Sequence, residues 1–210
     1  MREQRNEMSV FNYNTLGDGW IDLLGRVASN GKLINDELYE LRHINFFIEK
    51  ISENDEIIQK YANFDNIVEM KKVFFSHENN KFGHSYVDLI SGPKLMKDLS
   101  DVTELLKSDI FSKKGAVVFV SSEAHVPCIQ SIQFLVRDNK LETSYFARAQ
   151  DAYIKLYADI IAISHLGQCI ADCLDITESS LYASIVSLHI RKKDMQYAKD
   201  LLKTINRSKL

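Results

Sequence analysis

A long, mostly apolar stretch at residues 151–172 constrains the fold of this chain more than any other feature, and it predicts a helix. One acidic residue, Asp159, lies inside the apolar run at 153–163. A carboxylate in such surroundings costs free energy unless it is paired or used. Two interpretations stay open: a structural ion pair with Lys155, four residues earlier, or a functional carboxylate.

Helices and strands are mixed along the rest of the chain. Apolar residues recur at helical intervals in four segments, which predicts helices at 18–30, 65–75, 98–107 and 194–205. Apolar or period-two segments predict strands at 38–51, 115–121 and 182–190. The last helix is expected to turn Tyr197 inward. Because the two kinds of element do not alternate strictly, the expected class is α+β.

A β-hairpin is predicted in the centre of the chain. Residues 128–137 alternate between apolar and polar, and the alternation resumes at Leu141 after a polar turn at 138–140. This hairpin can bring Arg148 back toward Cys128. A reactive cysteine needs positive charge nearby, because the thiolate is the nucleophile. The alternative interpretation is that Cys128 is a buried thiol on an apolar strand.

The composition is that of an ordinary globular protein. With 210 residues and 45% hydrophobic content the chain can bury a core, and we expect one domain over 1–210. A net charge of -3 argues against a general nucleic-acid or membrane binder. The N-terminus has no apolar stretch and the three cysteines are an odd, sparse set, so we expect a cytoplasmic protein.

Cys169 and Cys173 follow His165 at one-turn spacing on the predicted helix, which invites a metal-site interpretation. The outer two residues are about 12 Å apart along a helix axis. One zinc ion holds its ligands at roughly 2.0–2.3 Å, so it cannot reach both ends. We therefore expect core-packing thiols here, and no metal.

Two polar clusters could hold an anion. Lys113 and Lys114 directly precede a predicted strand, and Arg148 lies at the start of a polar cluster at 148–151, where a strand meets a helix. Paired ammonium groups, or a guanidinium beside a helix N-terminus, suit a phosphate. Each cluster alone is equally compatible with a solvated turn.

The order and spacing of these clusters resemble the thymidylate synthase and pyrimidine-nucleotide hydroxymethylase superfamily, over about residues 65–191. The matching motifs are, in order, Ser112-Lys113-Lys114, Pro127-Cys128, Gln133-Phe134, Arg148-x-x-Asp151, Asp159 and His189. The resemblance implies a mixed β-sheet covered by helices, with one sheet face forming a dimer interface. It also implies a transferase of one-carbon groups that acts on a pyrimidine nucleoside monophosphate.

The resemblance assigns chemical roles by position. Cys128 is the catalytic nucleophile that adds to carbon 6 of the pyrimidine, so that carbon 5 attacks the one-carbon unit of the cosubstrate 5,10-methylenetetrahydrofolate. Glu69 matches the catalytic glutamate, which orders water and assists proton transfer. Asp151 is expected near the folate.

Substrate-binding roles follow in the same way. Arg148 is expected to bind the phosphate and to favour the thiolate form of Cys128. Lys113 and Lys114 stand where the superfamily has an arginine pair that reaches the phosphate of the other subunit, which implies a homodimer with shared active sites. The remaining substrate-binding positions are Gln133, Ala149, His189, expected at the sugar, and Arg191.

Asp159 separates the subfamilies. Thymidylate synthases have Asn at this position, whereas a carboxylate accepts from the exocyclic amine of cytosine. The resemblance is therefore closest to CMP and dCMP hydroxymethylases, in which water rather than hydride completes the reaction. Only residues 192–210 follow the histidine motif, and a short end suits an enzyme that must admit water.

Several positions depart from the superfamily pattern. Ala149 replaces a serine, a lysine pair replaces the arginine pair, Ile129 replaces a histidine and Arg191 replaces a tyrosine. Because these changes gather around phosphate and sugar, we favour CMP over dCMP. The alternatives are a thymidylate synthase and a nucleotide-binding homologue with impaired catalysis. A papain-like hydrolase built on Cys128 and His189 lacks that family's local pattern.

Overall fold

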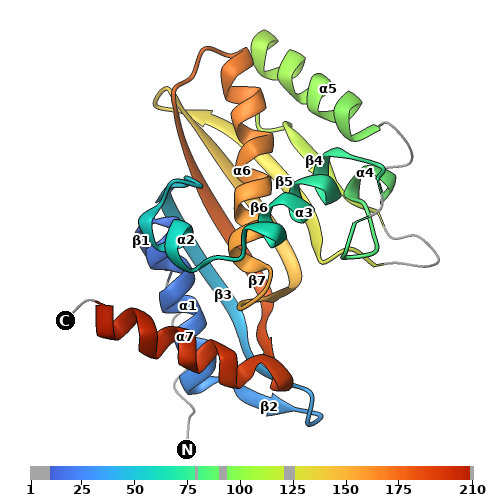
Figure 1. The fold of residues 1–210 in the computed structure, drawn as a ribbon. Coiled ribbons are helices and arrows are strands. Elements are labelled where there is room, and N and C mark those ends of the chain that lie inside the picture. The colour runs from blue at the N-terminus through green and yellow to red at the C-terminus, as the bar shows by residue number, and fades with distance from the viewer. Residues whose placement is uncertain (1–9, 79, 90–93, 121–125, 209–210) are drawn as a thin grey trace, which may run out of the picture.

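The computed structural model describes residues 10–78, 80–89, 94–120 and 126–208. Within them, one mixed sheet has the strand order β1-β3-β7-β6-β5-β4, with β2 paired to β3 (Figure 1). The strands are β1 (Val10–Thr15), β2 (Lys32–Ile34), β3 (Leu38–Lys50), β4 (Ala116–Val118), β5 (Ile129–Arg137), β6 (Lys140–Asp151) and β7 (Glu178–Arg191). β3–β7 and β5–β6 are antiparallel, whereas β1–β3 and β6–β7 are parallel. The predicted α+β class is confirmed.

The helices are α1 (Leu16–Asn30), α2 (Glu56–Tyr61), α3 (Phe64–Phe75), α4 (Tyr86–Leu89), α5 (Lys94–Ser108), α6 (Leu156–Cys173) and α7 (Met195–Ser208). The four helices predicted outside 151–172 are present, although α5 begins four residues earlier than expected. The inward prediction for Tyr197 is wrong, because this side chain is 65% exposed at the edge of the buried stripe of α7. The short elements β1, β2, α2 and α4 carry too few residues for a clear period and were not predicted.

The predicted hairpin is confirmed as β5 and β6. Asp138 and Asn139 form its two-residue turn, with φ of 50° and 60°. Positive φ at both central residues is what a right-twisted two-residue hairpin requires, and Asn and Asp tolerate it. The pairing returns the Arg148 N–H to the Cys128 carbonyl at 2.9 Å, as expected.

The predicted apolar helix is α6, but it begins five residues later than expected. Asp151 ends β6, and its Oδ1 accepts from the N–H groups of Tyr153 and Ile154, both at 3.0 Å. These are the hydrogen bonds of a helix N-cap, and the Lys155 N–H donates to the Asp151 carbonyl at 3.1 Å, so a turn at 152–155 precedes the regular helix, which begins at Leu156. The turn places Asp151 on the sheet edge rather than in the helix.

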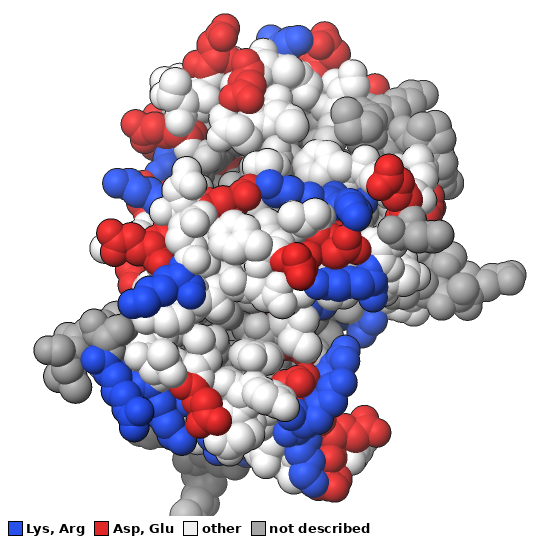
Figure 2. All heavy atoms as spheres, in the orientation of Figure 1, with Lys and Arg blue, Asp and Glu red and all other residues white. Residues whose placement is uncertain are grey.

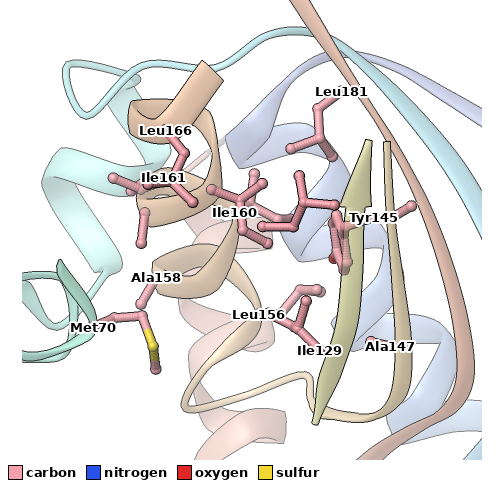
Figure 3. Close-up of a cluster of buried hydrophobic side chains, with 14 of the residues drawn as sticks. Met70, Ile129, Tyr145, Ala147, Leu156, Ala158, Ile160, Ile161, Leu166 and Leu181 are labelled. Carbon is pink, nitrogen blue, oxygen red and sulfur yellow. The ribbon is translucent and has the colours of Figure 1, made fainter. Parts of the chain in front are cut away.

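Helix α6 is buried on two sides. Figure 3 shows Leu156 and Ile160 directed toward the sheet, where Ile129 and Tyr145 lie, and Ala158 directed toward Met70 of α3. The helix therefore lies between the sheet and α3, which explains why its apolar residues are not confined to one stripe.

The helical layer covers one face of the sheet (Figure 1). The opposite face exposes large apolar side chains: Val118 at 59%, Phe146 at 40% and Tyr182 at 41%. The ring of Phe47 lies against Tyr182, with centroids 4.6 Å apart. We refer to Phe47, Val118, Phe146 and Tyr182 as the open face. Apolar surface of this kind commonly marks an interaction site.

The helix-covered side has a mixed surface, because basic and acidic side chains are interspersed over it (Figure 2). Among the described residues, no helix has both the length and the apolar content that a bilayer crossing requires.

Truncation of Ile160 tests the central position of α6. Ile160 is fully buried, so Ile160→Ala should lower the free energy of unfolding by about 2–5 kcal/mol, measured by urea denaturation. Val68 on α3 is 52% exposed, and Val68→Ala should change stability by less than about 0.5 kcal/mol. Equal losses in the two variants would contradict the packing described here.

Candidate active site

A cavity of about 460 Å³ opens where the end of β6, the start of α6 and the end of β7 meet. Its lining residues are Lys81, Phe82, His84, Cys128, Ala149, Gln150, Asp151, Lys155, Asp159, His189 and Arg191. The structure thus brings together Cys128, Ala149, Asp151, Asp159, His189 and Arg191 from the predicted site. Asp151 and Asp159 of this cavity, 4% and 3% exposed, are the buried carboxylates of the described residues.

Asp159 is 3% exposed and is held by a chain of hydrogen bonds. Gln150 Nε2 donates to Asp159 Oδ2 at 2.9 Å, and Gln150 Oε1 accepts from the Tyr145 hydroxyl at 2.9 Å. Burial raises the pKa of Asp159, while the charge of Lys155 and the Gln150 hydrogen bond oppose that rise. The structural ion pair with Lys155 does not form among the described residues. Lys155 instead lies over the ring of Phe82, 4.5 Å from its centroid.

Asp151 Oδ2 and His189 Nδ1 are buried polar atoms of the cavity residues that have no hydrogen-bond partner within the described part of the chain. Arg191 is the cation beside Asp151, with its Nε 3.7 Å from Asp151 Oδ2. Buried polar atoms are nearly always satisfied in folded proteins, so orphaned ones beside a cavity indicate ligand-binding positions. One oxygen of Asp151 therefore shapes the turn, and the other is available to a ligand.

Cys128 lies just before β5 and is partly buried. Arg148 fixes the segment that leads into it, because its Nε donates to the Pro127 carbonyl at 3.0 Å and its Nη2 to the Val126 carbonyl at 2.9 Å. The next residue, Ile129, donates its N–H to the buried Tyr86 hydroxyl at 2.9 Å. The backbone around the thiol is therefore held from both sides.

Five predicted site residues do not line the cavity of this chain. Glu69 on α3 pairs with Lys72 at 2.8 Å and accepts from the Lys81 N–H at 2.8 Å. Both contacts lower the pKa of the Glu69 carboxyl, and the hydrogen bond from Lys72 has the larger effect. Lys113 and Lys114 are exposed, and Gln133 Nε2 donates to the Lys113 carbonyl at 2.9 Å. Arg148 also lies outside the lining, against the backbone at 126–127.

The prediction of buried thiols at Cys169 and Cys173 is wrong, because both are exposed. They lie near the end of α6, where the helix keeps a solvent-facing stripe that also contains His165. The described residues contain no group of three or more His, Cys, Asp or Glu side chains that could hold a metal ion.

Several cavity residues were not predicted: Lys81, Phe82, His84, Gln150 and Lys155. Tyr86 was also missed. Gln150 lies within the Arg148-x-x-Asp151 motif and Lys155 lies one helical turn before Asp159, so both positions could have been found from the sequence. The segment at 81–86 has no motif, and only tertiary packing brings it to Cys128.

Known proteins that are similar to this chain identify its family. The family model described as "Thymidylate synthase" matches residues 32–209, which is most of the chain and includes every residue of the cavity. The chain belongs to the thymidylate synthase family. Its members are one-carbon transferases, and the family uses methylenetetrahydrofolate as cosubstrate.

Relatives in this family are distant. A protein of Methanosarcina barkeri named "Putative thymidylate synthase" is 24% identical over 217 residues, covering 97% of this chain and 100% of the relative. A protein of the same name from Methanothermobacter thermautotrophicus is 20% identical over 218 residues, covering 90% and 96%. Thermostable thymidylate synthase A from Bacillus subtilis has the same fold, with a TM-score of 0.67 at 12% identity over 90% of this chain and 84% of that one. The predicted thymidylate synthase-like fold is thus confirmed.

The ionised form of Asp159 should lower the free energy of unfolding. Because burial raises its folded-state pKa, its contribution to stability is largest when it is protonated and falls as pH rises through the folded pKa. Asp159→Asn keeps an acceptor for Gln150 without the charge, so its melting temperature should exceed that of the wild type at pH above neutrality. The difference should shrink as pH falls toward the ordinary pKa of aspartate. A variant that melts lower at every pH would show that the charge is compensated.

Proposed function

We propose that this member of the thymidylate synthase family is a cytidylate 5-hydroxymethylase. It acts on CMP, or dCMP, and transfers a one-carbon unit from methylenetetrahydrofolate to carbon 5 of cytosine, followed by addition of water. The observation that carries the proposal is the buried carboxylate of Asp159, in the same cavity as the Cys128 thiol.

Base recognition follows from the hydrogen-bonding capacity of Asp159. An ionised carboxylate only accepts, and Gln150 Nε2 already donates to Oδ2. The remaining acceptor capacity suits the exocyclic amine of cytosine and a protonated N3. Uracil presents a carbonyl oxygen where cytosine has the amine, and two oxygens without a proton between them repel.

Cys128 supplies the nucleophile. Its thiolate forms a bond to carbon 6, and the electron pair of the 5,6 double bond moves to carbon 5, which becomes nucleophilic. Carbon 5 takes the one-carbon unit and loses its proton, and the bond between that carbon and the folate nitrogen breaks, which would release tetrahydrofolate. Water then adds to the exocyclic carbon, and the sulfur–carbon bond breaks. The clamped backbone at 127–129 holds the thiol in place during these steps.

Methylenetetrahydrofolate supplies the one-carbon unit when it is bound. Asp151 fits such a group, because its Oδ2 is buried, has no hydrogen-bond partner and belongs to a cavity-lining residue. A pterin offers amino and ring N–H donors that this acceptor can bind. Arg191 Nε lies 3.7 Å from the same oxygen.

Phosphate and sugar binding complete the nucleotide site. His189 Nδ1 is an unpartnered polar atom suited to a ribose hydroxyl, and Arg191 adds positive charge at the same wall. Arg148 has further N–H donors beside the Cys128 segment that bond to none of the described residues. The altered residues Ala149 and Arg191 favour CMP over dCMP, because they change the contacts available to phosphate and sugar.

We also propose a homodimer formed by the open face. The phosphate lysines Lys113 and Lys114 lie outside the cavity of their own chain and adjoin β4, at the edge of that face. Pairing of two open faces would bury their apolar side chains and carry the lysines toward the partner's cavity. Gln133 lies on β5, where it holds the Lys113 carbonyl.

Two other functions compete with this proposal. A thymidylate synthase is favoured by the names of the relatives, and its distinguishing product is dihydrofolate. A binding-only homologue is favoured by Glu69, which is engaged by Lys72 and does not line the cavity.

Product analysis separates the three functions. The protein, incubated with methylenetetrahydrofolate and each of CMP, dCMP, UMP and dUMP, should give hydroxymethylated cytosine nucleotides by mass spectrometry and no dihydrofolate by absorbance. Asp159→Asn should move the preference toward uracil by on the order of 10²-fold or more, since a site built for a donor rejects an analogue lacking it. Hydroxymethylation confined to uracil nucleotides in the wild type would contradict the proposal.

Cys128→Ser is the control for catalysis. Wild-type protein should release tritium from carbon 5 of labelled CMP, and the serine variant should lose that exchange. Cys169→Ser, at an exposed position on the far part of α6, should exchange like the wild type. Absence of exchange in the wild type would favour the binding-only homologue.

Substitution of Tyr182 tests the dimer. Tyr182→Glu places a charge in the open face, so light scattering should show a monomer where the wild type is a dimer. Tyr197→Glu is the matched control, because Tyr197 is 65% exposed on α7, and it should leave the dimer intact. A wild-type monomer, or an unchanged dimer in Tyr182→Glu, would count against this interface.

A further inference from the structure

The cavity wall carries a cation to which the chemistry above gives no role. Lys155 lies between the end of β6 and the start of α6, and its ammonium is 4.5 Å from the centroid of the Phe82 ring. Lys81 approaches the same ring at 5.5 Å but bonds to Asn66. Lys155 forms no ion pair with any carboxylate of the described residues. Its charge is therefore held at the cavity without being neutralised by a salt bridge.

The backbone fixes Lys155 relative to Asp159. The Asp159 N–H donates to the Lys155 carbonyl at 2.8 Å, so the two residues are one helical turn apart and on one face. Cation–π attraction to Phe82 keeps the ammonium at the cavity wall instead of in bulk solvent. Both side chains line the same cavity, so the ammonium acts on the carboxyl through a partly dehydrated space.

The other groups around Asp159 do not replace this charge. They are Tyr86 of α4, Cys128 before β5, Tyr145, Gln150 and Asp151 of β6, His189 and Arg191 of β7, and Lys81 and His84. Burial raises the pKa of Tyr86 and of Tyr145, so both hydroxyls stay neutral. Asp151 raises the pKa of Asp159. Among the described cations, Lys155 is the one whose charge lowers it.

Building on the proposed function, we propose that Lys155 determines base selectivity by keeping the Asp159 carboxyl ionised while a pyrimidine is bound. A neutral carboxyl has one donor and one acceptor, so it can pair with cytosine or with uracil. Cytosine can instead take up a proton from solvent on N3 and then donate twice to an ionised carboxylate, and an ammonium beside Asp159 favours this position of the proton over one on the carboxyl. Uracil cannot, because its N3 already bears a hydrogen and its O4 holds a proton very weakly. Full pairing with uracil therefore requires a protonated Asp159, which the ammonium disfavours.

Binding of CMP and UMP to the full chain tests this role without turnover. Calorimetry at one pH near neutrality, without folate, should show that Lys155→Gln lowers the ratio of CMP to UMP affinity by about tenfold, the change that one unit in a protonation equilibrium produces. Proton uptake on UMP binding, from buffers of different ionisation enthalpy, should be larger in the wild type than in Lys155→Gln.

Three further variants sharpen the comparison. Lys155→Arg keeps the charge and can lie over Phe82, so it should keep the wild-type ratio. Phe82→Leu removes the ring that holds the ammonium, so it should lower the ratio in the same direction even if Lys155→Gln does not fold. Lys60 lies over the ring of Tyr61 at 5.2 Å, outside the cavity, and Lys60→Gln is the matched control that should change neither affinity.

The outcomes distinguish the two proposals. A CMP preference that survives both Lys155→Gln and Phe82→Leu overturns the role of Lys155 and leaves the proposed function standing. A wild-type preference for UMP overturns the proposed function, and the selectivity role with it. Loss of the ratio in Lys155→Arg would also overturn the role, because the charge is retained there.

Discussion

The burial of α6 between the sheet and α3 is the constraint on which the rest of the structure depends. The helix fills the core with apolar side chains, yet it carries Asp159 into that core at 3% exposure. The carboxyl is tolerated because Gln150 and Tyr145 of the adjacent strand extend a hydrogen-bond chain to it. Since β6 runs directly into α6, the same short segment supplies the helix, the carboxyl and its support.

Asp151 couples this packing to the cavity. One carboxylate oxygen caps the turn that follows the strand by binding two backbone N–H groups. The turn sets Lys155 just before the first helical turn, where its side chain can reach the cavity wall. The Lys155 N–H donates to the Asp151 carbonyl at 3.1 Å, so one helix-like turn spans 151–155 before the regular helix begins. A local turn therefore decides which charges face the ligand.

Much of this arrangement could be predicted from the sequence, because it depends on local pattern and on chain order. Alternation and the Asp138-Asn139 turn indicate the hairpin, and the hairpin brings Arg148 to the Cys128 segment. The start of α6 could not be predicted in this way, because the apolar period does not show the turn at 152–155 that precedes the regular helix. Phe82 and Tyr86 escaped notice because only long-range packing of a motif-free segment brings them to the site.

The cavity of a single chain contains some of the predicted site residues but not the lysine pair. It contains the Cys128 thiol, which we propose as the nucleophile, and the Asp159 carboxyl, which we propose binds the base, both placed by β5, β6 and α6. The cation pair at Lys113 and Lys114 lies elsewhere, beside a sheet face that exposes apolar rings. The cavity itself has the cations Lys81, Lys155 and Arg191, which lie beside Asn66, Phe82 and Asp151. Assembly through the open face would cover the apolar rings and would add the lysine pair as further cations for a dianionic phosphate.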